Sequence, residues 1–331
     1  MSIETIPLLR ASQVRPFLAA IDHIGAPRER YLRQAKLPLL VYDDAEVVIP
    51  ELFLWGLLDK LAHNENIEDF GLIVATHTPL CQAEPEFIGW LQSLPNLWIA
   101  LTTFCLVARQ FSTADQFSIV RHGNYALLQR SQCLGIPGEH QVELYDLKIM
   151  IQLVQLAGGQ DWMPSEVHVS EVNARLLSKQ KEFEHVRIRH SNAHTCVVIP
   201  SAMLAWPMNQ LSHLSGLQLP DALPDSFLES LSAAIGPYLQ DGNMNIQLAA
   251  EMASLSKRTL QRRLADLQLD YSTLIDQIRL KQALSMLRKP DVPMAEIAYE
   301  LGYSAPTHFT RAFRRWTALS PQEYRRQHQA T

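Results

Sequence analysis

Apolar side chains recur at a helical period near the end of the chain. Four of them fall on one face of a helix over residues 294–301: Met294, Ile297, Ala298 and Leu301. Gly302 follows where that helix is expected to end, because glycine adopts a left-handed backbone at little cost. Ser304 is expected to cap the next helix, and Pro306 suits its first turn, where a missing N–H leaves nothing unpaired. The pattern predicts two helices joined by a tight turn.

The second of these helices separates its side chains by type. Aromatic residues gather on one side: Phe309, Phe313 and Trp316. Hydroxyl and guanidinium groups gather on the opposite side: Thr307, Thr310, Arg311 and Arg314, with Arg315 at the edge. On the second helix of a helix-turn-helix, such a face fits the major groove of DNA, where guanidinium groups pair with guanine or phosphate. The alternative is an ordinary helical hairpin with a solvated cationic face.

The same pattern occurs earlier, over about residues 246–267. A short helix, Ile246–Ala253, is followed by a second helix that Ser256 is expected to cap. The inward side chains of that second helix are Leu260, Leu264 and Leu267, and the outward ones are Arg258, Gln261 and Arg262. A helix over residues 272–287 joins the two units, and its 16 residues span ~24 Å. A spacer of this length suits two reading helices placed near adjacent major grooves, which recur about every 34 Å.

The first two thirds of the chain show a different mixture of periods. Helices are expected in two segments of residues 10–36, separated at residues 25–27, and then at Glu51–His63, Asp69–Ala75, Ile88–Ala108 and Glu139–Leu156. Alternating residues predict a hairpin over Phe117–Ser131 with its turn at residues 123–124, and short strands at Val167–Val169, Val186–Ile188 and Thr195–Ile199. We therefore expect an α+β N-terminal domain, made of helices plus a small sheet, followed by an all-α C-terminal domain.

The predicted helix Glu139–Leu156 is apolar on more than one side. Such a helix is either buried entirely in its own domain or shared with a second subunit. Both interpretations remain open from the sequence.

The composition is that of a globular protein long enough for two domains. The chain has 331 residues, of which 47% are hydrophobic and 19% charged. The net charge of −5 is unevenly distributed, since residues 221–331 hold 13 basic and 12 acidic residues. The basic residues there form two clusters: Lys257, Arg258, Arg262 and Arg263, and then Arg311, Arg314, Arg315, Arg325 and Arg326. A polyanion would bind these clusters whatever the net charge.

Motifs of other functional classes are missing from the sequence. The four cysteines, Cys81, Cys105, Cys133 and Cys196, form no C-x-x-C pair, so buried free thiols are expected. Neither a G-x-S-x-G motif nor a phosphate-binding loop occurs. Histidines and glutamates over residues 182–194 come nearest to a metal cluster, but Arg187 and Arg189 argue against a cation there. We expect no enzyme activity, no cofactor and no metal, and no signal or membrane segment.

Together these residues resemble the AraC/XylS family of transcription regulators. The second unit carries the resemblance at Ile297-Ala298, Leu301–Ser304, Phe309–Trp316 and Ser320–Arg325, and the first unit at Ser256, Leu260–Leu264 and Arg279–Ala283. The N-terminal part is similar to a branch with an arabinose-binding-type effector and dimerisation domain, through Val14–Gly25, Asp43-Asp44, Ile49-Pro50 and Asp69–Leu72.

The resemblance implies a bacterial cytoplasmic regulator, usually an activator, that binds double-stranded promoter DNA near RNA polymerase. It implies an effector-binding and dimerisation domain at 1–215, a linker at 216–224, and a DNA-binding domain at 225–331 with helix-turn-helix units at about 246–267 and 294–316. A homodimer and a small-molecule effector of unknown identity are expected partners. The alternatives are an enzyme domain fused to a DNA-binding tail, and a ligand-independent regulator controlled by a protein partner.

The family pattern also assigns roles to individual residues. Base-reading positions fall on Arg258, Gln261, Arg262, Thr307 and Arg311. Phosphate contacts are expected of Lys257, Arg263, Arg314, Arg315 and Arg325, with intramolecular pairing as the alternative for the four arginines. Gln268 and Ala318 stand where the family often has glycine, so the two reading helices are expected to end differently or to run on. Pro306 removes one possible base contact.

Aromatic residues of the N-terminal part are candidates for lining an effector pocket: Trp90, Trp98, Phe104, Phe117 and Tyr125. Plain hydrophobic core is the alternative for each of them.

Overall fold

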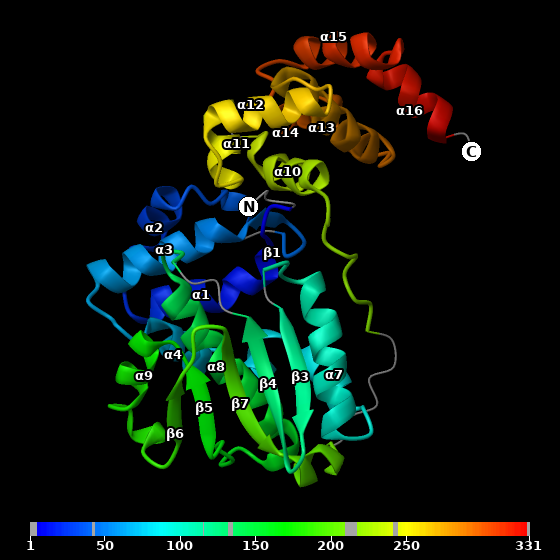
Figure 1. Ribbon diagram of the computed structural model, residues 1–331. Helices are drawn as coiled ribbons and strands as arrows, with labels where there is room; N and C mark the ends of the chain where they lie inside the picture. Colours follow the sequence, from blue (N-terminus) through cyan, green and yellow to red (C-terminus); the bar gives the residue numbers. More distant parts are fainter. Residues whose placement is uncertain are drawn as a thin grey trace. The chain divides into compact units, whose positions relative to one another are not determined.

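The computed structural model describes residues 5–41, 44–114, 116–131, 135–208, 217–240 and 244–329 (Figure 1). Asp43, Cys133 and Gly216, which the sequence interpretation used, lie outside the described residues. The chain forms two compact units. Unit 1 contains residues up to Pro7, Val48–Pro50 and residues from Pro224 onward, and unit 2 contains Leu8–Val47 and Glu51–Leu223.

Unit 2 is an α+β unit. Its helices are α1 (Arg15–His23), α2 (Arg28–Gln34), α3 (Glu51–Asn64), α4 (Phe70–His77), α5 (Leu80–Ala83), α6 (Pro85–Gln92), α7 (Leu97–Val107), α8 (Glu139–Gly158) and α9 (Glu171–Leu177). Its strands are β1 (Leu8–Arg10), β3 (Phe117–His122), β4 (Tyr125–Ser131), β5 (Glu166–Val169), β6 (Arg187–His190) and β7 (His194–Pro200). Most predicted elements are present with boundaries shifted by a few residues.

Five of these strands form one sheet in the order β3-β4-β7-β5-β6. The pairs are antiparallel except β5 and β6, which are parallel. The predicted hairpin is confirmed: β3 and β4 are joined by residues 123 and 124, and Gly123 has a φ of 57°. A left-handed residue at the first position of a two-residue turn suits the twist of a hairpin, and glycine adopts it without strain.

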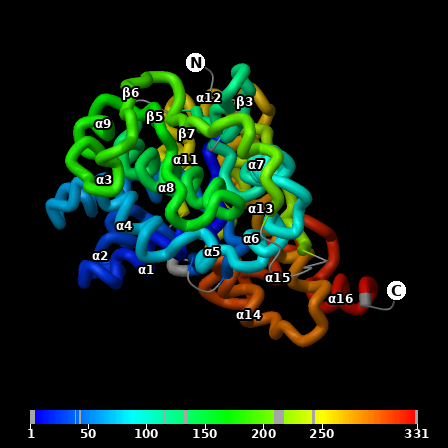
Figure 2. Tube along the Cα trace, turned by 90° about the horizontal axis from the view of Figure 1, so that it is seen from below, coloured from blue at the N-terminus to red at the C-terminus, as the bar shows by residue number. Residues whose placement is uncertain are grey.

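Helix α8 is the centre of unit 2. Figure 2 shows it between the strands and α4, and it contacts β7 on one side and α3 and α4 on the other. Its apolar side chains on several faces are buried within the single chain. Burial in its own unit thus accounts for the apolar pattern of Glu139–Leu156 without a second subunit.

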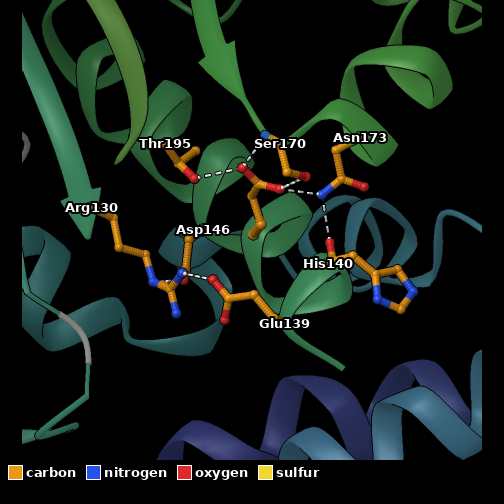
Figure 3. Close-up of polar contacts among 8 residues, drawn as sticks. Arg130, Glu139, His140, Asp146, Ser170, Asn173 and Thr195 are labelled. Atoms are coloured by element: carbon orange, nitrogen blue, oxygen red, sulfur yellow. Dashed lines mark hydrogen bonds and ion pairs between the residues drawn. The ribbon is translucent and has the colours of Figure 1, made fainter. Parts of the chain in front are cut away.

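A buried polar network, which the sequence interpretation missed, ties α8 to the sheet (Figure 3). Arg130 of β4 is fully buried and pairs with Glu139 at 2.9 Å and with Asp146 at 2.7 Å. One turn away on α8, the Glu143 carboxylate accepts hydrogen bonds from Ser170, Asn173 and Thr195. Buried charges are tolerated when they are paired and hydrogen-bonded in this way.

Two expectations for this unit are wrong. Residues 88–108 are not one buried helix: α6 ends at Gln92 and α7 begins after Asn96, whose side chain caps it by accepting the N–H of Ile99 at 3.0 Å. Pro95 lacks a backbone N–H and disfavours a helical residue before it, so the break falls there. Cys81 is exposed, whereas burial raises the pKa of the Cys105 thiol to about 12 and that of Cys196 to about 11.

In unit 1, the described residues from Pro224 onward form helices joined by turns. The helices are α10 (Phe227–Ile235), the short 3-10 helix η6 (Gly236–Tyr238), α11 (Ile246–Met252), α12 (Lys257–Asp266), α13 (Tyr271–Leu287), α14 (Met294–Glu300), α15 (Pro306–Thr317) and α16 (Pro321–Gln329). The short strand β2 (Val48–Pro50) contacts α10, and the N–H of Ile6 donates to the Ser230 hydroxyl at 3.0 Å. The expected fold class, an α+β part followed by two helix-turn-helix units with a joining helix, is confirmed.

The described residues contain no helix whose length and apolarity would allow it to cross a membrane.

Candidate nucleic-acid interface

Helix α12 is capped at its N-terminus and buried along one side. The Ser256 hydroxyl accepts the N–H of Thr259 at 3.1 Å, so the predicted cap is confirmed. Leu260 and Leu264 are buried, and the helix packs against α11. Leu267, which was expected to face inward, is 49% exposed because the helix has already ended before it.

The opposite side of α12 is open to solvent. The exposed side chains there are Lys257, Arg258, Gln261 and Arg262. The buried leucines on the other face leave this polar face outward.

Helix α15 is held by an aromatic core. Phe309 and Phe313 are fully buried against Ile297, Ala298 and Leu301 of α14 and its C-terminus. Trp316 packs against this cluster while partly exposed. The predicted aromatic face therefore seats α15 on α14.

The start of α15 differs from the expectation. Its N-cap residue is Ala305, which provides no side-chain hydrogen bond, and Pro306 is the first helical residue. Ser304 lies one position too early to cap, and its hydroxyl instead lies 3.3 Å from Nδ1 of His308. A recognition-type helix with an uncapped N-terminus leaves its first N–H groups to other partners.

The outward face of α15 carries Thr307, Arg311 and Arg314, all exposed. With Pro306 and Thr310 they line a shallow hollow of about 360 Å³. His308, which the sequence interpretation did not name, is exposed beside Thr307. The position of His308 in the first turn of the helix was the sequence signal that could have identified it as a candidate.

The two helices offer their candidates at matching positions. Arg258 and Thr307 each stand two residues after the N-cap of their helix, and Gln261 and Thr310 each stand five residues after it. The internal repeat seen in the sequence is thus a repeat of geometry as well.

The turn between α14 and α15 is closed as predicted by Gly302, which has a φ of 76°. The N–H of Gly302 donates to Tyr299 and that of Tyr303 to Ala298, each at 2.9 Å, so the last carbonyls of α14 are paired. Gly302 also allows a close approach, since a Cβ there would lie 2.1 Å from the carbonyl oxygen of Leu239.

The expectation about the ends of the reading helices is wrong. Gln268 and Ala318 adopt left-handed backbones, with φ values of 57° and 63°, and the helices stop there as they would at glycine. The hydrogen bonds of the turn outweigh the crowding of a Cβ in this conformation, which costs roughly 1–2 kcal/mol.

The expected phosphate-contacting residues fall into two groups. Lys257 and Arg314 are exposed. The other three have partners inside unit 1. The Arg263 guanidinium lies 4.3 Å from the centre of the Phe227 ring, Arg315 pairs with Asp276 at 2.7 Å, and Arg325 donates to the carbonyl oxygens of Pro290 and Val292.

Helix α13 joins the two reading units. It begins after Asp270, whose carboxylate accepts the N–H of Thr273 at 2.8 Å, and this bond lowers the pKa of Asp270. Its 17 residues correspond to about 26 Å of helix.

The other candidates lie in unit 2. Phe104 is buried and in edge-to-face contact with the partly exposed Phe117 at 5.1 Å, and the partly exposed Trp90 packs near Phe87 at 5.9 Å. Trp98 lies under the Arg121 guanidinium, and Tyr125 is 44% exposed. Among the residues that the structure describes, no three His, Cys, Asp or Glu side chains are placed to hold a metal ion.

A family model described as a helix-turn-helix domain matches residues 249–327, which run from α11 into α16. The chain is similar to the ornithine utilization regulator of Pseudomonas aeruginosa, at 37% identity over 81 residues, which is 24% of each protein. It is similar to the HTH-type transcriptional regulator VirS of Mycobacterium tuberculosis, at 37% identity over 87 residues and 26% of each protein. The HTH-type transcriptional activator RhaS of Escherichia coli is 36% identical over 101 residues, 30% of this chain and 36% of RhaS.

The alignment with a solved structure extends along most of the chain. The transcriptional regulator CdpR of Pseudomonas aeruginosa covers 95% of this chain and 98% of its own at 20% identity, with a TM-score of 0.38.

These matches and the geometry of α11–α16 identify the C-terminal part as a helix-turn-helix domain similar to those of these transcription regulators. The domain is of the AraC/XylS family. The chain spans only about a quarter of the length of the first curated relatives it matches, and the matched relatives are regulators, not enzymes.

Proposed function

We propose that this protein is a sequence-specific, double-stranded-DNA-binding transcription regulator that reads its site with α12 and α15. The observation that carries the proposal is the pair of exposed polar and basic helix faces, each seated on a buried apolar face. An exposed face of this chemistry on the second helix of a helix-turn-helix suits the major groove.

Within this proposal, the base-reading residues are Arg258, Gln261 and Arg262 on α12, and Thr307 and Arg311 on α15. The two-pronged guanidinium groups of Arg262 and Arg311 suit guanine O6 and N7, and the Gln261 amide suits adenine N6 and N7. The Thr307 methyl suits the thymine methyl group. His308 joins this set because it is exposed in the same first turn.

Lys257 and Arg314 are proposed as phosphate contacts, because both are exposed at the ends of the base-reading faces. Arg263, Arg315 and Arg325 are assigned to intramolecular roles because of their contacts with Phe227, Asp276, Pro290 and Val292. These contacts thus divide eleven candidate side chains between bases, phosphates and the fold.

The two reading helices are proposed to enter successive major grooves on one side of the duplex. The length of α13, about 26 Å, is of the same order as the groove repeat of ~34 Å.

The test is to select DNA sites for the full chain from a random-sequence library and to measure affinity for the selected site by fluorescence anisotropy. The proposal expects a selected motif and at least ~1000-fold tighter binding to it than to scrambled DNA. Binding should weaken steeply with salt, with a slope of about −0.9 per phosphate contact. No enriched motif, or a flat salt response, would refute sequence-specific DNA binding.

Regulation by a small molecule is proposed for the N-terminal part, residues 1–215, with residues 216–224 as linker and residues 225–331 as DNA-binding domain. The proposal is supported by the separate α+β unit, which carries its own core and its own buried polar network. A ligand shifts DNA binding only if its affinity differs between two arrangements of the protein.

A homodimer that activates transcription together with RNA polymerase completes the proposal. It is tested by sedimentation of the full chain, and by transcription from a promoter carrying the selected site, with purified polymerase, in the presence and absence of amino and carboxylic acids. Activation that needs no small molecule would favour the alternative, a regulator controlled by a protein partner.

A further inference from the structure

Helix α13 contacts elements that precede the first reading unit in the chain and elements of the second. On one side it contacts α10 and η6, which lie before α11 in the chain. Its second half contributes Ala283 and Leu287 to the core that contains Ile297, Phe309 and Phe313. The second reading unit is therefore held by contacts along this one helix, which follows α12 in the chain.

Arg279 stands at the middle of α13 and reaches the turn between α14 and α15. Its Nε donates to the carbonyl oxygen of Leu301 at 3.1 Å. Its guanidinium lies over the ring of Tyr303, 4.8 Å from the ring centre. A cation at a helix C-terminus meets the partial negative charge of the last carbonyls, and a guanidinium stacks favourably on an aromatic face.

The same turn is held from a second direction. Gly302, between Leu301 and Tyr303, lies so close to the Leu239 carbonyl oxygen that a Cβ would be only 2.1 Å from it. Leu239 follows η6, which precedes α11 of the first reading unit in the chain. The turn that precedes α15 is thus clamped between the middle of α13 and the end of η6.

A weaker contact acts further along α15. Asp276, one turn before Arg279 on α13, pairs with Arg315 at 2.7 Å, with side chains 32% and 65% exposed. An exposed ion pair contributes little by itself, so the half-buried Arg279 is the stronger tie.

We infer that Arg279 is a positioning residue that fixes where α15 lies relative to α12, and thereby sets the spacing between the two parts of the DNA site. This inference rests on the proposed reading of DNA by both helices. Arg279 reads no base in this account; it acts through the turn at residues 301–303. Two linked binding elements gain affinity only when their separation matches that of their targets, so a loosened clamp should cost both affinity and spacing preference.

The experiment compares sites selected from a random-sequence library by the full-length wild type, Arg279→Met and Lys281→Met. Methionine keeps an apolar stem that can pack and removes the donors. Lys281 is exposed two residues further along the same helix. Lys281→Met is therefore the matched control, because it also removes one positive charge from α13 and introduces the same methionine side chain. Thermal unfolding of all three proteins checks that they are folded.

The expected result is that wild type and Lys281→Met enrich two short motifs at one fixed spacing. Arg279→Met should enrich the same two motifs at several spacings, and bind the wild-type site about tenfold more weakly. Gly302→Ala, which pushes the turn off Leu239 from the other side, should broaden the spacing in the same way.

Retention of a single spacing and full affinity in Arg279→Met would overturn the inference, and so would loss of the second motif altogether, which would mean that reading rather than positioning had failed. An absence of any motif for the wild type would instead overturn the proposed function itself, so the two failures are distinct.

Discussion

Arg262 and Arg311 occupy the same place in the two reading helices: each is the sixth residue after its N-cap, Ser256 or Ala305, and each side chain is exposed. A leucine or a phenylalanine buried two residues earlier, at 260 or 309, anchors the helix beneath it. Two guanidinium groups at equivalent positions are expected to do equivalent work on two stretches of DNA.

Removal of either arginine should weaken specific binding. Arg262→Ala and Arg311→Ala are each expected to cost ~1–3 kcal/mol on the selected site and to relax base preference at one position, because a two-pronged contact to one base is lost. Affinities for the site and for its single-base variants measure both effects. Lys257→Ala is the control, since losing a phosphate contact should weaken all sequences alike; equal loss of base preference in all three variants would contradict the assignment.

Two neighbouring arginines on α15 provide a matched pair. Arg314 is exposed, while Arg315 pairs with Asp276. Arg314→Ala should reduce the slope of log affinity against log salt by about 0.9, the value for one phosphate contact, and Arg315→Ala should change it much less. Anisotropy titrations over a series of salt concentrations give the slopes. A larger change for Arg315→Ala would reverse the assignment.

Helix α15 lacks a side-chain cap at its N-terminus, and one substitution can supply it. Ala305 has an extended backbone, with φ −153° and ψ 148°, and provides no side-chain acceptor. Ala305→Ser should therefore stabilise the protein by ~1 kcal/mol, and Ser256→Ala, which removes the existing cap of α12, should destabilise it by a similar amount. Urea unfolding measures both. A shift of the unfolding free energy in the same direction for both substitutions would contradict the assignment of the two N-caps.

Ala318 ends α15 in a left-handed conformation with a φ of 63°. Ala318→Gly should stabilise unit 1 by about 1 kcal/mol because it relieves the crowding of the Cβ. Ala265→Gly, at an exposed position inside α12, is the contrasting control and should destabilise by about the same amount. Thermal unfolding that showed destabilisation by both would contradict the strain assigned to residue 318.

The start of α16 should depend on pH. The Glu323 carboxylate accepts the N–H of Ser320 at 2.7 Å, and its hydrogen bonds with Ser320 hold its pKa below the ordinary value. A carboxyl whose pKa is lowered by folding stabilises the folded state above its unfolded pKa, about 4.3 for glutamate, and that contribution is lost as the pH falls through the folded pKa. Amide protection factors in α16, which correct the exchange rates for the pH dependence of intrinsic exchange, should therefore fall in this acid range.

Glu323→Gln keeps an acceptor for Ser320 and removes the titrating group. The variant should show a smaller acid-induced loss of protection in α16 than the wild type. Identical pH profiles would show that another group controls the end of the chain.

Local chemistry made much of unit 1 predictable. Phe309 and Phe313 fall four residues apart, so one helix face is decided by spacing alone, and the arginines opposite them follow. Gly302 marked its turn because few other residues tolerate that backbone. The prediction that Ser304 caps α15 was wrong, because a sequence does not distinguish a serine at the N-cap from a serine one position before it. Only the hydrogen-bond geometry shows that Ala305 occupies the N-cap.

Contacts between distant residues could not be predicted in this way. Arg130 pairs with Glu139 and Asp146 because strand β4 and helix α8 pack together, and the spacing of these residues along the chain does not predict that pairing. Arg279 belongs to a stretch that resembles the family, but its place in the sequence predicts no partner; its contacts with Leu301 and Tyr303 are seen only in the structure. The pairing of Arg315 with Asp276, 39 residues away, belongs to the same class.

The most direct test of the account is chemical protection of guanine N7 by the full chain across its selected site, read at single-base resolution for the wild type, Arg262→Ala and Arg311→Ala. The account predicts two groups of protected guanines about 10 base pairs apart, one lost in each variant. A single protected group, or the loss of the same group in both variants, would contradict the reading of two grooves by α12 and α15.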